Sequence, residues 1–263
     1  MKNYDMMAPN EIRELIRNQT ITGPTAGMSK GYTQANLVII KKEHAFDFLL
    51  FCQRNPKACP LLDVTEPGSF IPSKIADGAD IRKDIPKYRI YRDGVYTEEV
   101  KDITAYWEED MVGFLLGCSF TFEAPLIESG IPIRHIEENC NVPMYKTNVQ
   151  CEKAGLFEGP TVVSMRPMKP EDAIRAVQIT SRFPAVHGSP IHIGDPSQIG
   201  IADLSNPDFG DSVTIKEGEI PVFWACGVTP QAVAMQSKPS IMITHAPGCM
   251  FISDVKDEKL SVI

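Results

Sequence analysis

The spacing of apolar residues divides the chain into helical and extended segments. Apolar residues recur at three- to four-residue intervals over residues 9–18 and again over 171–183, as on one face of a helix. Pro9 opens the first of these segments and Pro170 precedes the second. The first turn of a helix tolerates proline. Together with the other apolar segments of suitable length, the pattern predicts helices over residues 9–18, 43–54, 103–116, 171–183 and 230–236.

Shorter apolar runs without a helical period are typical of buried strands. Such runs predict strands over residues 34–40, 161–168, 221–225 and 240–244. Residues 87–100 place β-favouring arms around Asp93-Gly94, a preferred two-residue hairpin turn. The strand–helix–strand order of residues 221–244 suggests local parallel pairing, because such units usually join parallel strands.

These elements predict an α/β fold with a mixed β-sheet and flanking helices. Strands and helices alternate near both ends of the chain, whereas the hairpin and an irregular segment, residues 131–148, interrupt the middle. We expect residues 1–263 to form a single domain that is built as two α/β lobes, with one lobe inserted into the other around residues 85–165.

Composition places the chain among ordinary globular proteins. Of its 263 residues 43% are hydrophobic and 23% are charged, with a net charge of −8. This charge argues against nucleic acid and anionic membranes as partners, since both attract clustered Lys and Arg. The start of the chain has no apolar signal-peptide core. We therefore expect a cytoplasmic protein that acts on a small molecule and that could form a homo-oligomer.

The cysteines favour neither a disulfide framework nor a zinc ribbon. There are seven, an odd number, and no CxxC pair occurs. Reduced and mostly buried thiols are the better interpretation.

Residues 180–201 concentrate titratable side chains among Gly, Pro and short apolar residues. Arg182, His187, His192 and Asp195 all lie in this segment. Buried or half-buried titratable groups are costly unless they are paired or used, so the segment is a candidate catalytic or ligand site.

Each of these residues also has a structural interpretation. Arg182 could clamp a carboxylate or bond the last carbonyls of its own helix. His187 and His192 are candidates for a proton shuttle, although their separation does not indicate a metal pair. Asp195 could orient a histidine or cap the turn that Pro196 begins.

Residues 117–123, GCSFTFE, offer a second set of candidates. A helix that starts near Ser119 would expose backbone donors able to hold a carboxylate. Glu123 could be a catalytic base or a favourable acid in the first turns of that helix. Cys118 could be a nucleophile, but a buried structural thiol is the more usual role for a free cysteine.

Two strand ends complete the candidate set. Gly227 and Thr229 follow a predicted strand and precede a helix, where donors could cradle a carboxylate, although the same residues also suit a helix cap. His245 follows the last predicted strand and adds a further acid/base candidate, or a structural histidine. We expect the site where residues 180–201, 226–229 and His245 meet.

Several long strings resemble a hydro-lyase family related to D-glutamate cyclase. They are GYTQANLVI (31–39), CQRNPKACPLLDVTEPG (52–68), GCSFTFE (117–123), residues 180–201, PVFWACGVTPQ (221–231) and HAPGCM (245–250). The resemblance implies loss of water from a small amino or hydroxy acid, with cyclisation of D-glutamate to 5-oxo-D-proline as the nearest example.

Such a reaction needs a cationic clamp for the α-carboxylate, a base for the ammonium group, and an acid for the departing oxygen. The sequence contains no phosphate loop or dinucleotide fingerprint, and we expect no cofactor and no bound metal. Two alternatives remain: a non-catalytic carboxylate-binding protein, and a metal-dependent hydrolase using His187, His192, His245 and Asp195.

Overall fold

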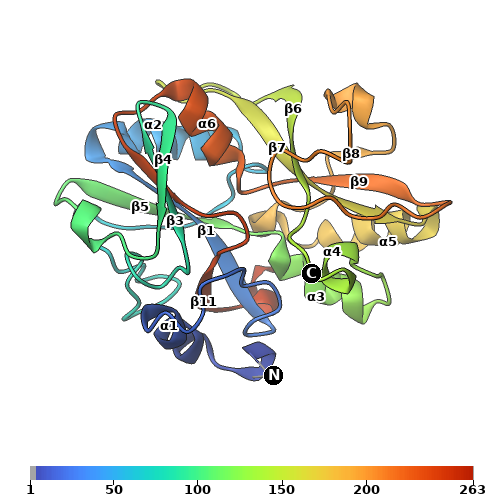
Figure 1. Ribbon diagram of the computed structural model, residues 1–263, viewed down its shortest axis with the longest axis horizontal. Coiled ribbons are helices and arrows are strands. Elements are labelled where there is room, and N and C mark those ends of the chain that lie inside the picture. Colours follow the sequence, from blue (N-terminus) through green and yellow to red (C-terminus); the bar gives the residue numbers. More distant parts are fainter. Residues whose placement is uncertain (1–3, 263) are drawn as a thin grey trace.

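The protein contains two β-sheets that lie side by side, with helices packed against both (Figure 1). The computed structural model describes residues 4–262. The expected α/β class is confirmed, and the strand pairs of both sheets are antiparallel.

The first sheet is organised around one long central strand, β1 (Tyr32–Lys41). β1 pairs along one side with β5 (Met111–Gly117), from Ala35 opposite Gly117 to Lys41 opposite Met111. Its other side pairs with two strands in succession. The order is β2-β5-β1-β10-β3-β4, with β11 also on β1; the remaining bounds are β2 (Leu61–Val64), β3 (Tyr88–Arg92), β4 (Val95–Val100), β10 (Met242–His245) and β11 (Phe251–Lys256).

The helix predicted over residues 103–116 is wrong, because the second part of this segment, from Met111 on, belongs to β5. A 3-10 turn, η2 (Thr104–Tyr106), precedes the strand. Leu115 packs into the core on one face of the sheet, and Phe114 and Leu116 pack into the core on the other. A strand buried on both faces is apolar at every position, and periodicity cannot distinguish such a run from a buried helix.

The second sheet has the order β6-β7-β9-β8. Its strands are β6 (Met144–Gln150), β7 (Pro160–Met168), β8 (His192–Ile193) and β9 (Ile220–Ala225). The parallel pairing expected within residues 221–244 is wrong, since β9 lies in this sheet and β10 in the first. The segment expected to be irregular contains the helix α4 (Arg134–Glu137) and the start of β6.

The other predicted elements are confirmed, including the hairpin, whose turn residues Asp93 and Gly94 both have positive φ. The helix over residues 43–54 exposes part of its apolar surface, with Phe46 73% exposed. The longer helices are α1 (Pro9–Arg17), α2 (Lys42–Arg54), α3 (Phe120–Glu128), α5 (Pro170–Thr180) and α6 (Thr229–Ser237). The remaining 3-10 helices are η1 (Tyr4–Met6), η3 (Pro184–Val186), η4 (Pro196–Ile199) and η5 (Asp257–Leu260).

Separate cores hold the helices against the sheets. Phe48 and Phe51 of α2 and Val233 of α6 pack on the first sheet. Phe122 of α3 and Ala176 of α5 pack on the second sheet, in the core that contains Trp224.

All strands of the second sheet fall between β5 and β10 in the sequence, whereas the hairpin β3–β4 belongs to the first sheet. We propose that the inserted lobe comprises residues 120–225 rather than residues 85–165. Within residues 4–262, no helix has both the length and the apolar character needed to cross a membrane.

Candidate active site

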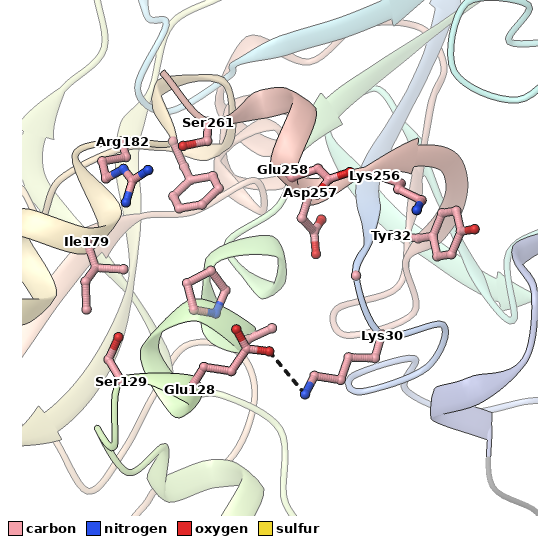
Figure 2. Close-up of a pocket in the computed structure, with 14 residues that line it drawn as sticks. Lys30, Tyr32, Glu128, Ser129, Ile179, Arg182, Lys256, Asp257, Glu258 and Ser261 are labelled. Carbon is pink, nitrogen blue, oxygen red and sulfur yellow. Dashed lines mark ion pairs between the residues drawn. The ribbon is translucent and has the colours of Figure 1, made fainter. Parts of the chain in front are cut away.

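A surface cleft of about 780 Å³ lies where segments far apart in the sequence come together (Figure 2). The starts of β1 and η5, the end of α3, and the residues after α5 form its walls. Arg182 stands on one side of the cleft and Asp257 opens η5 on another. A cleft of this size is in the range of small-molecule sites.

Asp257 is the carboxyl group with the most unusual environment in the cleft. Its side chain is largely buried, and Oδ1 accepts a hydrogen bond of 3.0 Å from Thr33 Oγ1. Burial disfavours the charged form and raises the pKa of Asp257 to about 6, even though the hydrogen bond from Thr33 acts in the opposite direction. Near neutral pH this group can therefore both give and take a proton.

Charges of both signs line the same cleft. Lys30, Arg182 and Lys256 are basic, whereas Glu128, Asp257 and Glu258 are acidic. Lys30 Nζ lies 3.3 Å from Glu128 Oε1, as the dashed line in Figure 2 shows.

The guanidinium of Arg182 makes no hydrogen bond to the carbonyls of its own helix among the described residues. The hydrogen bonds of Arg182 are main-chain ones: Arg182 N donates to the carbonyl of Ile179 at 3.2 Å, and the carbonyl of Arg182 accepts from Val262 N at 2.7 Å. The structure therefore does not show the alternative role of Arg182, in which its guanidinium bonds the last carbonyls of its own helix.

A second polar group lies buried between α3 and the second sheet. Arg166 on β7 is fully buried and donates from Nε to Glu123 Oε1 at 3.0 Å. The same guanidinium donates to Ser164 Oγ at 3.0 Å and to Ser119 Oγ at 3.1 Å. Ser119 and Glu123, two predicted site residues, are thus brought together by an arginine that the sequence analysis did not select.

His135 was missed as well. Its Nε2 lies 3.3 Å from Glu123 Oε1, and its ring lines a second pocket of about 440 Å³. Burial opposes ionisation of Glu123, but the neighbouring His135 and Arg166 outweigh it and lower the pKa of Glu123 to about 2. Arg166 could have been selected from the sequence, because it is a charged residue inside the apolar run of residues 161–168. No comparable pattern in the sequence marks His135 or Asp257.

The thiol proposed as a nucleophile is poorly suited to the role. Cys118 is buried, and burial raises the pKa of its thiol well above the ordinary range, which disfavours the reactive thiolate. All seven cysteines are free and six of them are buried, so the prediction of unpaired, mostly buried thiols is confirmed.

The predicted cradle at residues 227–229 is occupied by the protein itself. The side chain of Asn36 sits against Gly227 and donates to the carbonyl of Gly117 at 2.6 Å. Thr229 is fully buried, and its Oγ1 donates to the carbonyl of Cys226 at 2.7 Å. These residues fasten α6 to the junction of the two sheets.

The remaining histidines lie in separate places. His187 is buried with Nδ1 2.7 Å from the carbonyl of Lys57, and His245 is buried beside the main chain of Leu37. Burial lowers the pKa of each to about 4. His192 lies on the edge strand β8, with Nε2 2.7 Å from the carbonyl of Asp195.

Asp195 adopts the turn-capping role, because its Oδ1 accepts from Ser197 N at 3.0 Å. Among residues 4–262, no group of three or more His, Cys, Asp or Glu side chains could hold a metal ion. The ligand set suggested for a metal-dependent hydrolase is therefore not assembled.

Of the two pockets, the cleft fits an anionic substrate better. It combines Arg182 with a carboxyl group that titrates near neutral pH. The smaller pocket has no Lys or Arg in its lining. The cleft can therefore both hold a carboxylate and transfer protons beside it.

Comparison with known proteins gives a consistent result. Residues 112–254 match the family model described as "D-glutamate cyclase". Proteins named "Putative hydro-lyase" are similar over nearly the whole chain. The one from Geobacillus kaustophilus is 69% identical over 98% of both chains. The one from Bacillus pumilus is 65% identical over 100% of both, and the one from Bacillus subtilis is 66% identical over 98% of this chain and 100% of its own.

A solved structure of a nitrogen repressor-like protein from Methanococcus jannaschii aligns over 93% of this chain and 97% of that chain. Its TM-score of 0.38 and identity of 9% are too low to carry any conclusion.

Proposed function

Since the chain belongs to the D-glutamate cyclase family, we propose that it is a hydro-lyase that removes water from a small amino or hydroxy acid in the cleft of Arg182 and Asp257. D-glutamate, cyclised to 5-oxo-D-proline, is the first substrate to test. The observation that carries the proposal is that a guanidinium and a carboxyl group with a pKa of about 6 line one cleft.

Arg182 is assigned to the α-carboxylate. A planar guanidinium can donate two parallel hydrogen bonds to a carboxylate, which fixes both its position and its orientation. Lys256, on the η5 side of the cleft, adds positive charge for a second carboxylate. The cleft therefore suits an acid with two carboxylates better than a neutral molecule.

Asp257 is assigned to proton transfer. In the cyclisation the nitrogen bonds to the carbon of the γ-carboxylate group, and one carbon–oxygen bond at that same carbon breaks. The ammonium nitrogen loses two protons, and the departing oxygen gains two and leaves as water. One carboxyl group that accepts each proton from nitrogen and passes it to oxygen closes this balance without any other reagent.

The direct test is product detection. The full-length protein is incubated separately with D-glutamate, L-glutamate and a panel of small hydroxy acids, and the products are separated by chiral chromatography and identified by mass spectrometry. We expect a product lighter than its substrate by one water, and we expect Asp257→Asn to abolish its formation.

Lys259→Gln is the matched control, because Lys259 is exposed and is not part of the cleft lining. Saturable binding of the same acids without any product would instead support the non-catalytic carboxylate-binding alternative. Full activity of folded Asp257→Asn would exclude this cleft as the catalytic site.

A further inference from the structure

The start of β1 holds Asp257 by both its main chain and its side chain. Asp257 N donates to the carbonyl of Gly31 at 3.0 Å, and Asp257 Oδ1 accepts from Thr33 Oγ1 at 3.0 Å. These two bonds fix the backbone and one carboxyl oxygen of the residue that opens η5. Figure 2 shows the carboxyl group of Asp257 directed into the cleft.

An irregularity in the pairing of β1 with β11 lies at Thr33. The register of the two strands shifts there, so that Thr33 stands alone opposite three residues of β11, 253–255. Such bulges are frequent beside active sites, where they redirect a side chain. Here the bulge directly precedes Lys256 and Asp257, two residues of the cleft wall.

Thr33 has little freedom to turn away from Asp257. It is fully buried, and its main-chain carbonyl accepts from Ser253 Oγ at 2.8 Å. The same hydroxyl of Ser253 accepts from Val255 N at 3.2 Å, which satisfies main-chain groups that the bulge removes from the ladder. A β-branched side chain also has few rotamers. The hydroxyl of Thr33 is therefore a fixed partner for the carboxyl group.

This contact divides the two carboxyl oxygens of Asp257 between the protein and the cleft. Thr33 engages Oδ1, and within residues 4–262 no hydrogen bond engages Oδ2. Thr121 of α3 lies near the same carboxyl group, but its enclosed Oγ1 makes no hydrogen bond. Oδ2 is thus the oxygen left for a bound substrate.

We propose that Thr33 is a positioning residue for the reaction, which holds Asp257 by Oδ1 and leaves Oδ2 to exchange protons with the substrate. This inference rests on the function proposed for the cleft. Thr33 is not part of the cleft lining, so it acts only through Asp257. Because the hydroxyl donates to the carboxylate, it favours the ionised form, whereas a purely structural threonine would affect stability alone.

Other ionisable side chains surround the carboxyl group of Asp257. They are Lys30 and Tyr32 at the start of β1, Glu128 of α3, Arg182 after α5, and Lys256 and Glu258 on either side of Asp257. η3, which also packs against η5, has no charged residue. Removal of the Thr33 hydroxyl leaves all of these groups in place, so a changed titration of Asp257 reports the loss of that hydroxyl.

The first test titrates Asp257 by NMR in full-length protein labelled with ¹³C at the aspartate carboxyl groups. The signal of Asp257 is identified by its loss in Asp257→Asn. Thr33→Val, which removes the hydroxyl with little change of shape, should raise the pKa of Asp257, with an acid dissociation constant about tenfold lower. Thr33→Ser should restore the wild-type titration.

Thr147→Val is the matched control for this titration. It removes another buried threonine hydroxyl, which donates to the carbonyl of Thr161 at 2.8 Å in the second sheet. This variant should lose stability but leave the titration of Asp257 unchanged.

The second test measures kcat/KM against pH with the acid that gives product. The acid limb of this profile reports the ionisation of Asp257 in the free enzyme. Relative to its own value at pH 8.5, Thr33→Val should be about fivefold less active than the wild type at pH 6. KM at pH 8.5 should be unchanged, because Thr33 does not touch the substrate.

The possible failures can be distinguished. An unchanged titration of Asp257 in folded Thr33→Val would overturn the inference and leave the proposed function intact. An equal loss of activity at pH 6 and pH 8.5 would do the same. If the titration moves but the wild type forms no product from any acid tested, the proposed function fails, and the role of Thr33 in catalysis fails with it.

Discussion

Arg166 and Glu123 form an ion pair inside the protein, with Nε donating to Oε1 at 3.0 Å and with side-chain exposures of 0% and 5%. The pair joins β7 to α3 and so connects the second sheet with the helix that borders the cleft. Because a buried charge without its partner is costly, each member depends on the other.

Glu123→Gln should destabilise the protein by about 3–5 kcal/mol at neutral pH, since it leaves Arg166 buried without a counter-charge. Urea denaturation measures the loss. The pKa of Glu123 is lowered from 4.5 to about 2, so its contribution is complete above pH 4.5 and is lost as the pH falls toward 2. The variant and the wild type should therefore converge in acid. A difference that stays constant from pH 7 to pH 3 would contradict the assignment.

Arg182→Lys should fold normally but bind its acid substrate more weakly. Replacing the planar fork by a point charge should cost about 1–3 kcal/mol of binding, which is roughly five- to 150-fold in KM. Steady-state kinetics and a melting curve give the answer, with Arg92→Lys at the exposed end of β3 as the matched control. Unchanged kinetic constants would remove Arg182 from the site.

Asp257→Asn should stabilise the protein at pH 8 while it removes turnover. The pKa of Asp257 is raised from 3.8 in the unfolded chain to about 6 in the fold, so its ionisation opposes folding. This cost grows as the pH rises from about 4 to 6 and is then constant, at about 3 kcal/mol. Melting temperatures should match at pH 4 and differ by several degrees at pH 8; a lower melting temperature for the variant at pH 8 would refute the raised pKa.

Cys118→Ser should retain substantial activity, because burial raises the pKa of the thiol and so disfavours the thiolate that covalent catalysis needs. A modest loss of stability, about 1–3 kcal/mol, is expected from burying a hydroxyl. Cys226→Ser, another buried thiol, is the control for that loss. Near-complete loss of turnover in a well-folded Cys118→Ser protein would restore the nucleophile hypothesis.

Gly227→Ala should destabilise the junction of the sheets by about 1–3 kcal/mol, because the new methyl group would overlap the amide of Asn36. Displacing that amide also breaks its hydrogen bond to Gly117. Gly23→Ala is the control, since a methyl group there meets no atom within 4 Å. Equal thermal stability of the two variants would show that Asn36 is not held as the structure places it.

Local sequence signals determined several elements without help from the fold. The apolar period and Pro9 define α1, and the turn residues Asp93 and Gly94 define the hairpin of β3 and β4. These predictions succeed because the period of side chains and the turn geometry depend on neighbouring residues alone. The family resemblance also followed from long strings of sequence, and the family match confirms it.

Tertiary structure decided what local pattern could not. Residues 111–117 form a strand because β1 pairs with them along their whole length, although the same apolar run would suit a buried helix. Arg166 meets Glu123 only because β7 and α3 pack together, and Arg182 reaches the cleft of Asp257 only because the C-terminal segment lies beside the end of α5. Whether a charged side chain can take part in a functional site depends on its neighbours in space and on its burial. Local sequence determines neither of these.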